Sequence, residues 1–258
     1  MRLISIKSRA ENMTIKDLIN TDIIIGIIQK LGNQGRKFKS EAQFQFELAW
    51  ALKKYLQEQD CENKPEVILE HYSMFRKTED KIKKFFTDIM ILDGAGNYIP
   101  IELKYKTVSV KAADPFDDYG SHGATDLGRF DYLWDVKRIQ LLKYKNEPSF
   151  EFDKKLVNFC GGFAVLLTND NHYWKVTSES FPDRSNKPLY YNFCIGAGDV
   201  ISAEKKLRWK NDGTGTCVEN TWRNDHDYVV PLCFDREYVC EWRDYQGDKW
   251  FKYIIMEV

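Results

Sequence analysis

The chain has 258 residues, of which 43% are hydrophobic and 14% aromatic, so it can bury a substantial core as one large domain or two small ones. A formal net charge of −1 excludes a globally basic nucleic-acid-binding protein, and any contact with phosphates would need a local cluster of cations. The six cysteines include no C-x-x-C pair and there are only four histidines, which argues against a structural zinc site.

No long apolar run follows the first methionine, and the most apolar early stretch, Ile23–Ile28, is too short to cross a bilayer. We therefore expect a cytoplasmic protein with reduced thiols and no membrane partner.

Two helices are expected before the first strand. Thr14 is a suitable N-cap, and apolar residues at near-helical spacing predict a helix over about 14–30, which ends before Gly35. Ser40 is the N-cap of a second amphipathic helix, predicted over 41–58.

Three strands follow these helices. Residues 66–72 form the first, and Lys84–Thr107 reads as a β-hairpin. Its turn is Asp93–Asn97, because two glycines flanked by Asp and Asn are typical of tight turns. When the pairs are numbered outward from the centre of this turn, Leu92 falls opposite Tyr98.

The same numbering places Asp88 opposite Glu102. Like charges directly opposed on neighbouring strands are destabilising, and a divalent cation between the two carboxylates would remove the conflict. Because side chains alternate between faces, Glu102, Lys104 and Lys106 share the face of Asp88. The alternative is a solvent-facing polar edge that carries ordinary Glu–Lys pairs. The opposite face is expected to be core and carries Ile99, Ile101, Leu103 and Tyr105.

Asp88, followed after thirteen residues by Glu102-Leu103-Lys104, resembles the core motif of the PD-(D/E)xK nuclease superfamily, which has the restriction-endonuclease-like fold. Thr87 stands where the family name has proline. The resemblance implies a magnesium-dependent nuclease, a phosphodiester hydrolase, with Mn²⁺ as a substitute metal. DNA is the favoured substrate, and RNA is the alternative.

The resemblance also implies roles for individual residues. Asp88, Glu102 and the backbone carbonyl of Leu103 would hold the metal, and Lys104 would orient the attacking water. Many endonucleases of this superfamily pair to cut both strands, so a homodimer is compatible with it.

The first core helix of the superfamily often adds a glutamate to the site, within a Glu, apolar, Gln arrangement. Here Glu41, Phe44 and Gln45 match that arrangement, and Glu47 on the same helix is the competing candidate. A third alternative is that Glu41 is a first-turn carboxylate favoured only by the helix dipole. Glu70, near the end of the preceding strand, is a further acidic candidate.

A glycine- and aspartate-rich segment over 108–128 predicts a long loop over the site. His122 within it could act as a general base, although a lone loop histidine is more often a surface residue. An amphipathic helix is predicted over 127–144, where Arg138 either contacts phosphates or belongs to a salt-bridged face. A buried strand is expected over 159–168.

These elements predict an α/β (mixed α+β) fold with a central mixed β-sheet, an α-β-β-β-α-β core flanked by helices, and a β-rich C-terminal extension. We expect a single nuclease-like domain over 1–258. Its parts are an N-terminal helical arm (1–35), the core (40–176) and a β-rich C-terminal elaboration (177–258). The alternative function is a catalytically idle nuclease-fold module that binds nucleic acid or another partner.

Overall fold

The structure is a computed structural model that describes residues 14–59, 64–77, 82–111, 118–121, 125–182, 187–188, 190–209 and 231–258. Its helices are α1 (Ile15–Leu18), α2 (Thr21–Asn33), α3 (Glu41–Glu58), α4 (Thr125–Tyr144), α5 (Thr177–Ser180) and the 3₁₀ helix η2 (Tyr191–Phe193). Its strands are β1 (Glu66–Lys77), β2 (Ile82–Leu92), β3 (Asn97–Lys106), β4 (Phe150–Phe152), β5 (Asn158–Phe159), β6 (Phe163–Thr168), β7 (Val200–Ile201), β8 (Tyr238–Val239), β9 (Trp242–Asp244) and β10 (Lys252–Glu257). None of the helices in these segments is long and apolar enough to cross a membrane.

A mixed sheet of eight strands forms the centre of the described structure, in the order β4-β1-β2-β3-β6-β10-β9 with β5 beside β3. β1, β2 and β3 are antiparallel neighbours, whereas β3 and β6 are parallel. The predicted α/β class with a central mixed sheet is therefore confirmed. The order α3-β1-β2-β3-α4 is as expected, and two short strands, β4 and β5, precede β6.

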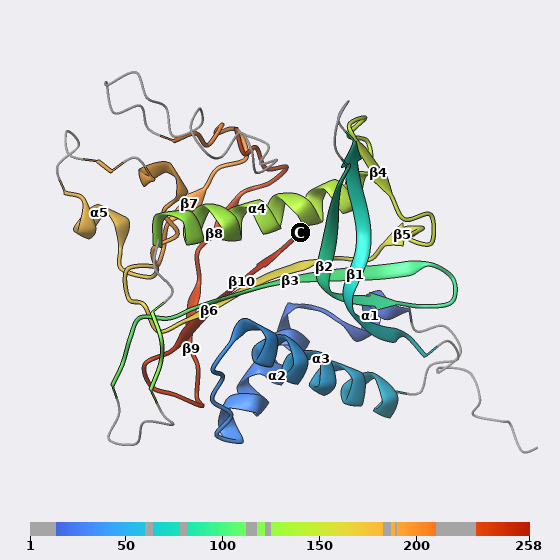
Figure 1. The fold of residues 1–258 in the computed structure, drawn as a ribbon, viewed down its shortest axis with the longest axis horizontal. Helices are drawn as coiled ribbons and strands as arrows, with labels where there is room; N and C mark the ends of the chain where they lie inside the picture. The colour runs from blue at the N-terminus through green and yellow to red at the C-terminus, as the bar shows by residue number, and fades with distance from the viewer. Residues whose placement is uncertain are drawn as a thin grey trace, which may run out of the picture.

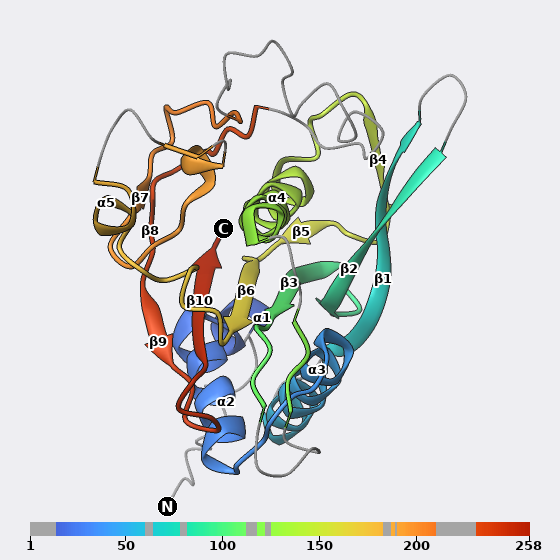
Figure 2. The ribbon, with the colours of Figure 1, turned by 60° about the vertical axis from the view of Figure 1, so that its left-hand side comes forward.

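Helices cover both faces of this sheet (Figure 1). α1, α2 and α3 lie against one face and α4 lies against the other, as the second view also shows (Figure 2). The alternating positions Ile99, Ile101, Leu103 and Tyr105 of β3 are at most 2% exposed and pack on the side of α2 and α3, which confirms them as core. Since α4 covers the opposite face, the polar residues of β3 are also enclosed.

The N-terminal arm differs from prediction because its single helix is interrupted. Ile19 has extended backbone angles, and Asn20 begins a new helix by accepting a hydrogen bond from the Ile23 amide at 3.0 Å. The apolar residues of α1 and α2 join the core cluster beneath the sheet. In contrast, α3 has the predicted bounds, and the Ser40 hydroxyl accepts from the Gln43 amide.

The C-terminal segment contributes strands to the central sheet. β10 pairs with β6 and β9, so residues 252–257 belong to the central sheet. β7 and β8 form a separate two-stranded sheet that packs beside α4. Within the segment expected to be β-rich, Tyr191–Phe193 is instead the 3₁₀ helix η2.

β1 and β2 extend beyond the rest of the sheet. β2 pairs with β1 from Ile82 to Leu92, but it pairs with β3 only from Ile89 to Leu92. Residues 82–87 therefore pair with β1 but not with β3. This β1–β2 ribbon, which β4 joins on the other edge of β1 at Met74–Arg76, rises past α4 in Figure 1. β2 and β3 separate beyond the Ile89–Ile101 pair, and we call the space between the two strands there the fork.

The hairpin turn determines where this fork lies. Leu92 pairs with Tyr98, as predicted from the turn residues. Gly96 has a φ of +80°, and a Cβ there would lie 2.7 Å from the Lys155 carbonyl oxygen and 2.6 Å from a methyl group of Val157. The turn therefore requires glycine at this position.

Gly96→Ala should lower the free energy of unfolding by about 1–3 kcal/mol, because it adds left-handed backbone strain and a clash with backbone. Gly94→Ala is the matched control, since a Cβ at Gly94 has no atom within 4 Å and should change stability by less than about 0.5 kcal/mol. Urea unfolding of both variants tests this. Equal destabilisation by the two substitutions would contradict the assignment.

Candidate functional site

The fork between β2 and β3 leaves backbone amides of β3 without a strand partner on one side. The last paired residues are Ile89 and Ile101. One position further, the Oδ2 atom of Asp88 accepts a hydrogen bond from the Leu103 amide at 2.6 Å. Because enclosed amides need acceptors, the carboxylate replaces the missing strand. Asp88 is thereby fixed to the backbone between Glu102 and Lys104.

The first turns of α3 close the same fork. Glu41 Oε2 accepts from the Tyr105 amide at 2.8 Å. One helical turn later, Gln45 Nε2 donates to the Asp88 carbonyl at 2.7 Å and to Glu70 Oε1 at 2.6 Å. Residues four apart share one face of a helix, so Glu41 and Gln45 reach the fork together. Glu70, which has a positive φ of 50°, joins the site through Gln45.

The other side of the site is formed by α4. Glu102 is only 1% exposed, and its Oε1 lies 3.0 Å from Nη2 of Arg138. Lys104 Nζ lies 2.9 Å from Asp135 Oδ2, and Arg138 Nη1 donates to Asp135 Oδ1 at 3.3 Å. The alternative of a solvent-facing polar edge is therefore wrong, because α4 covers this face.

The buried charges of this cluster do not balance. Among the described residues, the carboxylates of Asp88, Glu102 and Asp135 face two cations, Lys104 and Arg138, which leaves one negative charge in excess when all three carboxylates are ionised. Neither carboxylate oxygen of Glu102 accepts a hydrogen bond from the described residues, since its ion pair with Arg138 is close but poorly aligned. Such a site favours an additional positive charge.

The protonation equilibria reflect this excess. Burial raises the pKa of Asp88 from 3.8 to about 6, with the Lys104 charge opposing the rise and the Asp135 charge adding to it. Burial also raises the pKa of Glu102 well above its usual value, although Arg138 opposes this. Burial alone would lower the pKa of Lys104, but the nearby carboxylates, chiefly Asp135, raise it above its usual value. Lys104 is therefore a permanent cation and cannot serve as a base at neutral pH.

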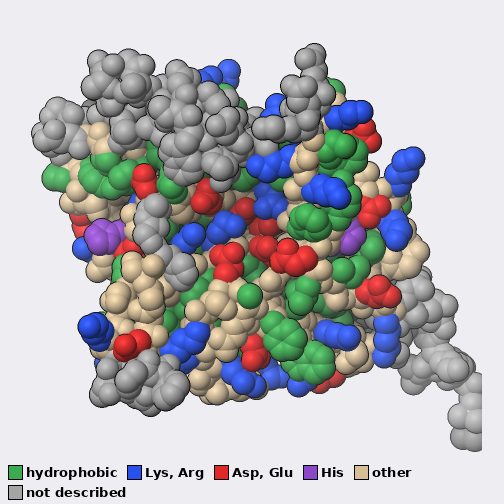
Figure 3. Space-filling view, in the orientation of Figure 1, with side chains coloured by type: hydrophobic (Ala, Val, Ile, Leu, Met, Phe, Trp, Pro, Cys, Tyr) green, Lys and Arg blue, Asp and Glu red, His purple; other side chains and the backbone are tan. Residues whose placement is uncertain are grey.

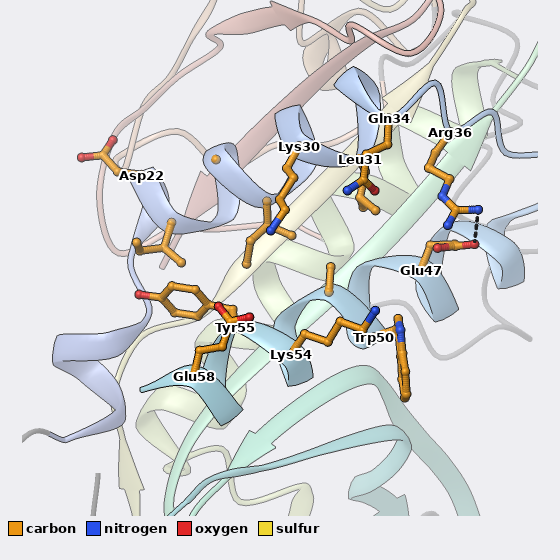
Figure 4. Close-up of a pocket in the computed structure, with 14 residues that line it drawn as sticks. Asp22, Lys30, Leu31, Gln34, Arg36, Glu47, Trp50, Lys54, Tyr55 and Glu58 are labelled. Carbon is orange, nitrogen blue, oxygen red and sulfur yellow. Dashed lines mark ion pairs between the residues drawn. The ribbon is translucent and has the colours of Figure 1, made fainter. Parts of the chain in front are cut away.

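The competing helix residue, Glu47, faces Arg36 and not Asp88 or Glu102. Its Oε1 lies 3.6 Å from Nη1 of Arg36, and both residues line a cavity of about 370 Å³ between α2 and α3 (Figure 4). Of the two glutamates, Glu41 is the one that lies beside this region, where it accepts from the Tyr105 amide and its charge acts on Lys104.

Three further candidates remain, namely Lys106, Arg138 and His122. Lys106 lies next to the first turns of α4, because a Cβ added to Gly128 of that helix would be 3.4 Å from the Lys106 Cε atom. Arg138 belongs to the buried cluster, where it also donates to the Phe86 carbonyl. His122 lies outside the described residues.

Asp135 was not identified as a site residue from sequence, where it was assigned to a solvated or salt-bridged stripe of its helix. The available signal was its position three residues before Arg138 on the helix that follows the Glu-x-Lys strand. Its role in holding Lys104 depends on how α4 packs across the sheet.

Asp88 and Lys104 are partly exposed, whereas Glu102 is buried. Figure 3 shows acidic side chains gathered near the centre of one face of the molecule, over the space between α4 and α3, with lysine and arginine side chains on the side of α4. Within the described part of the chain, no three acidic, histidine or cysteine residues gather closely enough to form a metal-binding group. The oxygens of Asp88, Glu102 and the Leu103 carbonyl are nevertheless of the type that Mg²⁺ prefers, and Glu102 has oxygens without hydrogen-bond donors.

Comparisons with protein-family models, with curated proteins and with solved structures find no match. The functional argument consequently depends on the residues and geometry of the chain itself.

The raised pKa of Asp88 predicts a pH-dependent gain in stability for Asp88→Asn. The folded state binds the Asp88 proton more tightly than the unfolded state does, so the stability contributed by this group is present below pH 4 and lost as pH rises through about 6. Asparagine retains an acceptor for the Leu103 amide but carries no charge. We expect the variant to be about 1–3 kcal/mol more stable than wild type at pH 7, with the difference disappearing near pH 4.

Urea unfolding between pH 4 and pH 8 measures this effect. Asp244→Asn is the control, because its side chain is 71% exposed and pairs with Lys252 at the surface. A difference between Asp88→Asn and wild type that stays constant across this pH range would contradict the electrostatic explanation.

Proposed function

We propose that this protein is a Mg²⁺-dependent nuclease that hydrolyses phosphodiester bonds of DNA, with a site of the PD-(D/E)xK type. The observation that carries the proposal is the hydrogen bond from the Leu103 amide to the Asp88 carboxylate. It brings the aspartate of the motif to the strand segment that carries the glutamate and the lysine. This proximity of the three side chains supports the proposal.

Asp88, Glu102 and the Leu103 carbonyl would hold the metal, with Glu41 next to them on the Tyr105 amide. The excess negative charge and the unbonded oxygens of Glu102 support this assignment. Bound Mg²⁺ supplies positive charge to the attacked phosphate and makes a bound water more acidic.

Lys104 has the properties needed for transition-state stabilisation. Its Nζ is positioned by Asp135 at 2.9 Å and by the Leu103 carbonyl at 3.4 Å. Since Lys104 stays protonated, it can donate to the attacking water or to a phosphate oxygen that gains negative charge. Asp135 restricts this side chain, which reduces the reorganisation required during the reaction.

The second candidate function is a catalytically idle module that keeps the nuclease fold and binds nucleic acid or another partner. The observation that favours it is the internal pairing of the motif, because Glu102 lies against Arg138 and Lys104 lies against Asp135. Mg²⁺-dependent cleavage distinguishes the two candidates, since an idle module would leave single-stranded, duplex and plasmid DNA intact.

We expect wild-type protein to cleave DNA with Mg²⁺ or Mn²⁺ and Lys104→Ala to be at least about 100-fold slower, because the variant loses its transition-state cation. Lys252→Ala is the control, since this lysine pairs with Asp244 on β9, at the far edge of the sheet. Mg²⁺ should also raise the melting temperature of wild type but not of Asp88→Asn. Equal cleavage rates for wild type and a folded Lys104→Ala variant would eliminate the proposed role of the lysine.

The choice between the two helix glutamates is testable in the same assay. Glu41→Gln should reduce cleavage by about 10-fold or more, because it removes a carboxylate charge beside Lys104. Glu47→Gln should retain wild-type activity, since Glu47 pairs with Arg36 at a separate cavity. The reverse order of effects would assign the helix position to Glu47.

A further inference from the structure

The ribbon formed by β1 and β2 carries a series of side chains that leads away from the acidic site. On β1, Tyr72 lies two residues after Glu70, whose positive φ of 50° interrupts the regular strand geometry. Its register partner on β2 is Phe86, which lies two residues before Asp88, about 7 Å along the strand. Lys84 lies two residues further from Asp88 on the same strand. The carboxylates are therefore adjacent to an aromatic pair.

The aromatic pair is open to solvent. Tyr72 and Phe86 are register partners, and their ring centroids are 5.6 Å apart. The two residues are 39% and 43% exposed, which is a large exposed fraction for aromatic side chains on paired strands. Phe75 lies 6.3 Å from the Tyr72 ring and extends the aromatic surface. Tyr72 and Phe75 also border a hollow of about 440 Å³.

The charge of the ribbon complements a phosphate backbone. Lys84 Nζ lies 5.5 Å from the Tyr72 ring centroid. The described ribbon residues 71–77 and 82–87 include Arg76, Lys77, Lys83 and Lys84, but no aspartate or glutamate. In a chain with a net charge of −1, this is a local basic segment directly beside the acidic site.

We propose that Tyr72, Phe86 and Lys84 form a binding platform for single-stranded nucleic acid, on which an unpaired base stacks beside the site where the neighbouring phosphate would be cleaved. The inference rests on the proposed function for the reaction at that phosphate. Exposed aromatic rings bind the faces of unpaired bases, and adjacent lysines contact the backbone. Base faces are covered inside a duplex, so the platform selects single strands or locally opened duplexes.

Binding and cleavage by the full chain separate the two proposals. Fluorescence anisotropy with a labelled single-stranded oligonucleotide in EDTA reports binding, and addition of Mg²⁺ reports cleavage. We expect Tyr72→Ala/Phe86→Ala to bind about 10- to 100-fold more weakly than wild type. Tyr72→Trp/Phe86→Trp should restore binding, since it keeps the stacking faces, and this rescue excludes a folding defect. Trp250→Ala is the control, because this exposed tryptophan also lies beside a lysine, Lys249, but far across the sheet.

The binding and cleavage results test the platform and the hydrolase proposal separately. Aromatic-dependent binding that favours the single strand over a blunt duplex of the same sequence supports the platform, even if Mg²⁺ produces no cleavage and the hydrolase proposal fails. Cleavage with binding that is unchanged in the alanine double variant overturns the platform but leaves the nuclease proposal intact. Equal affinity for the single strand and the duplex also overturns it, as does a wild type that binds no oligonucleotide.

Discussion

The separation of β2 from β3 is the constraint on which the site depends. Beyond Ile89 and Ile101 the β3 amides lose their strand partner, and an enclosed amide without an acceptor is destabilising. Asp88 and Glu41 provide those acceptors from β2 and α3. The same hydrogen bonds that complete the sheet therefore gather acidic side chains around one opening, so the fold and the site share these contacts.

A second consequence is the concentration of charge beneath α4. Burying an ion pair is tolerated only when each charge has a partner, and here the carboxylates outnumber the cations. Arg138 partly compensates Glu102, and Asp135 holds Lys104. This arrangement is consistent with a site that gains stability when it binds a cation. It also explains why Lys104 combines limited exposure with a permanent positive charge.

The sequence predicted the parts that depend on local chemistry. The turn residues Asp93–Asn97 set the hairpin register, and the position of Ser40 set the start of α3. Contacts between distant segments were not predictable in this way. The pairing of Lys104 with Asp135 requires α4 to pack across the sheet, and the entry of β10 beside β6 requires a pairing of residues almost ninety positions apart. The break at Asn20 was missed because apolar periodicity continues across it.

The central claim is that Asp88 and Glu102 together bind a divalent cation. Anomalous diffraction from crystals soaked in Mn²⁺ tests it most directly, because the metal is located without reliance on activity. The account predicts an anomalous peak bonded to oxygens of both carboxylates. Absence of a peak there, with Arg138 still paired to Glu102, would contradict it.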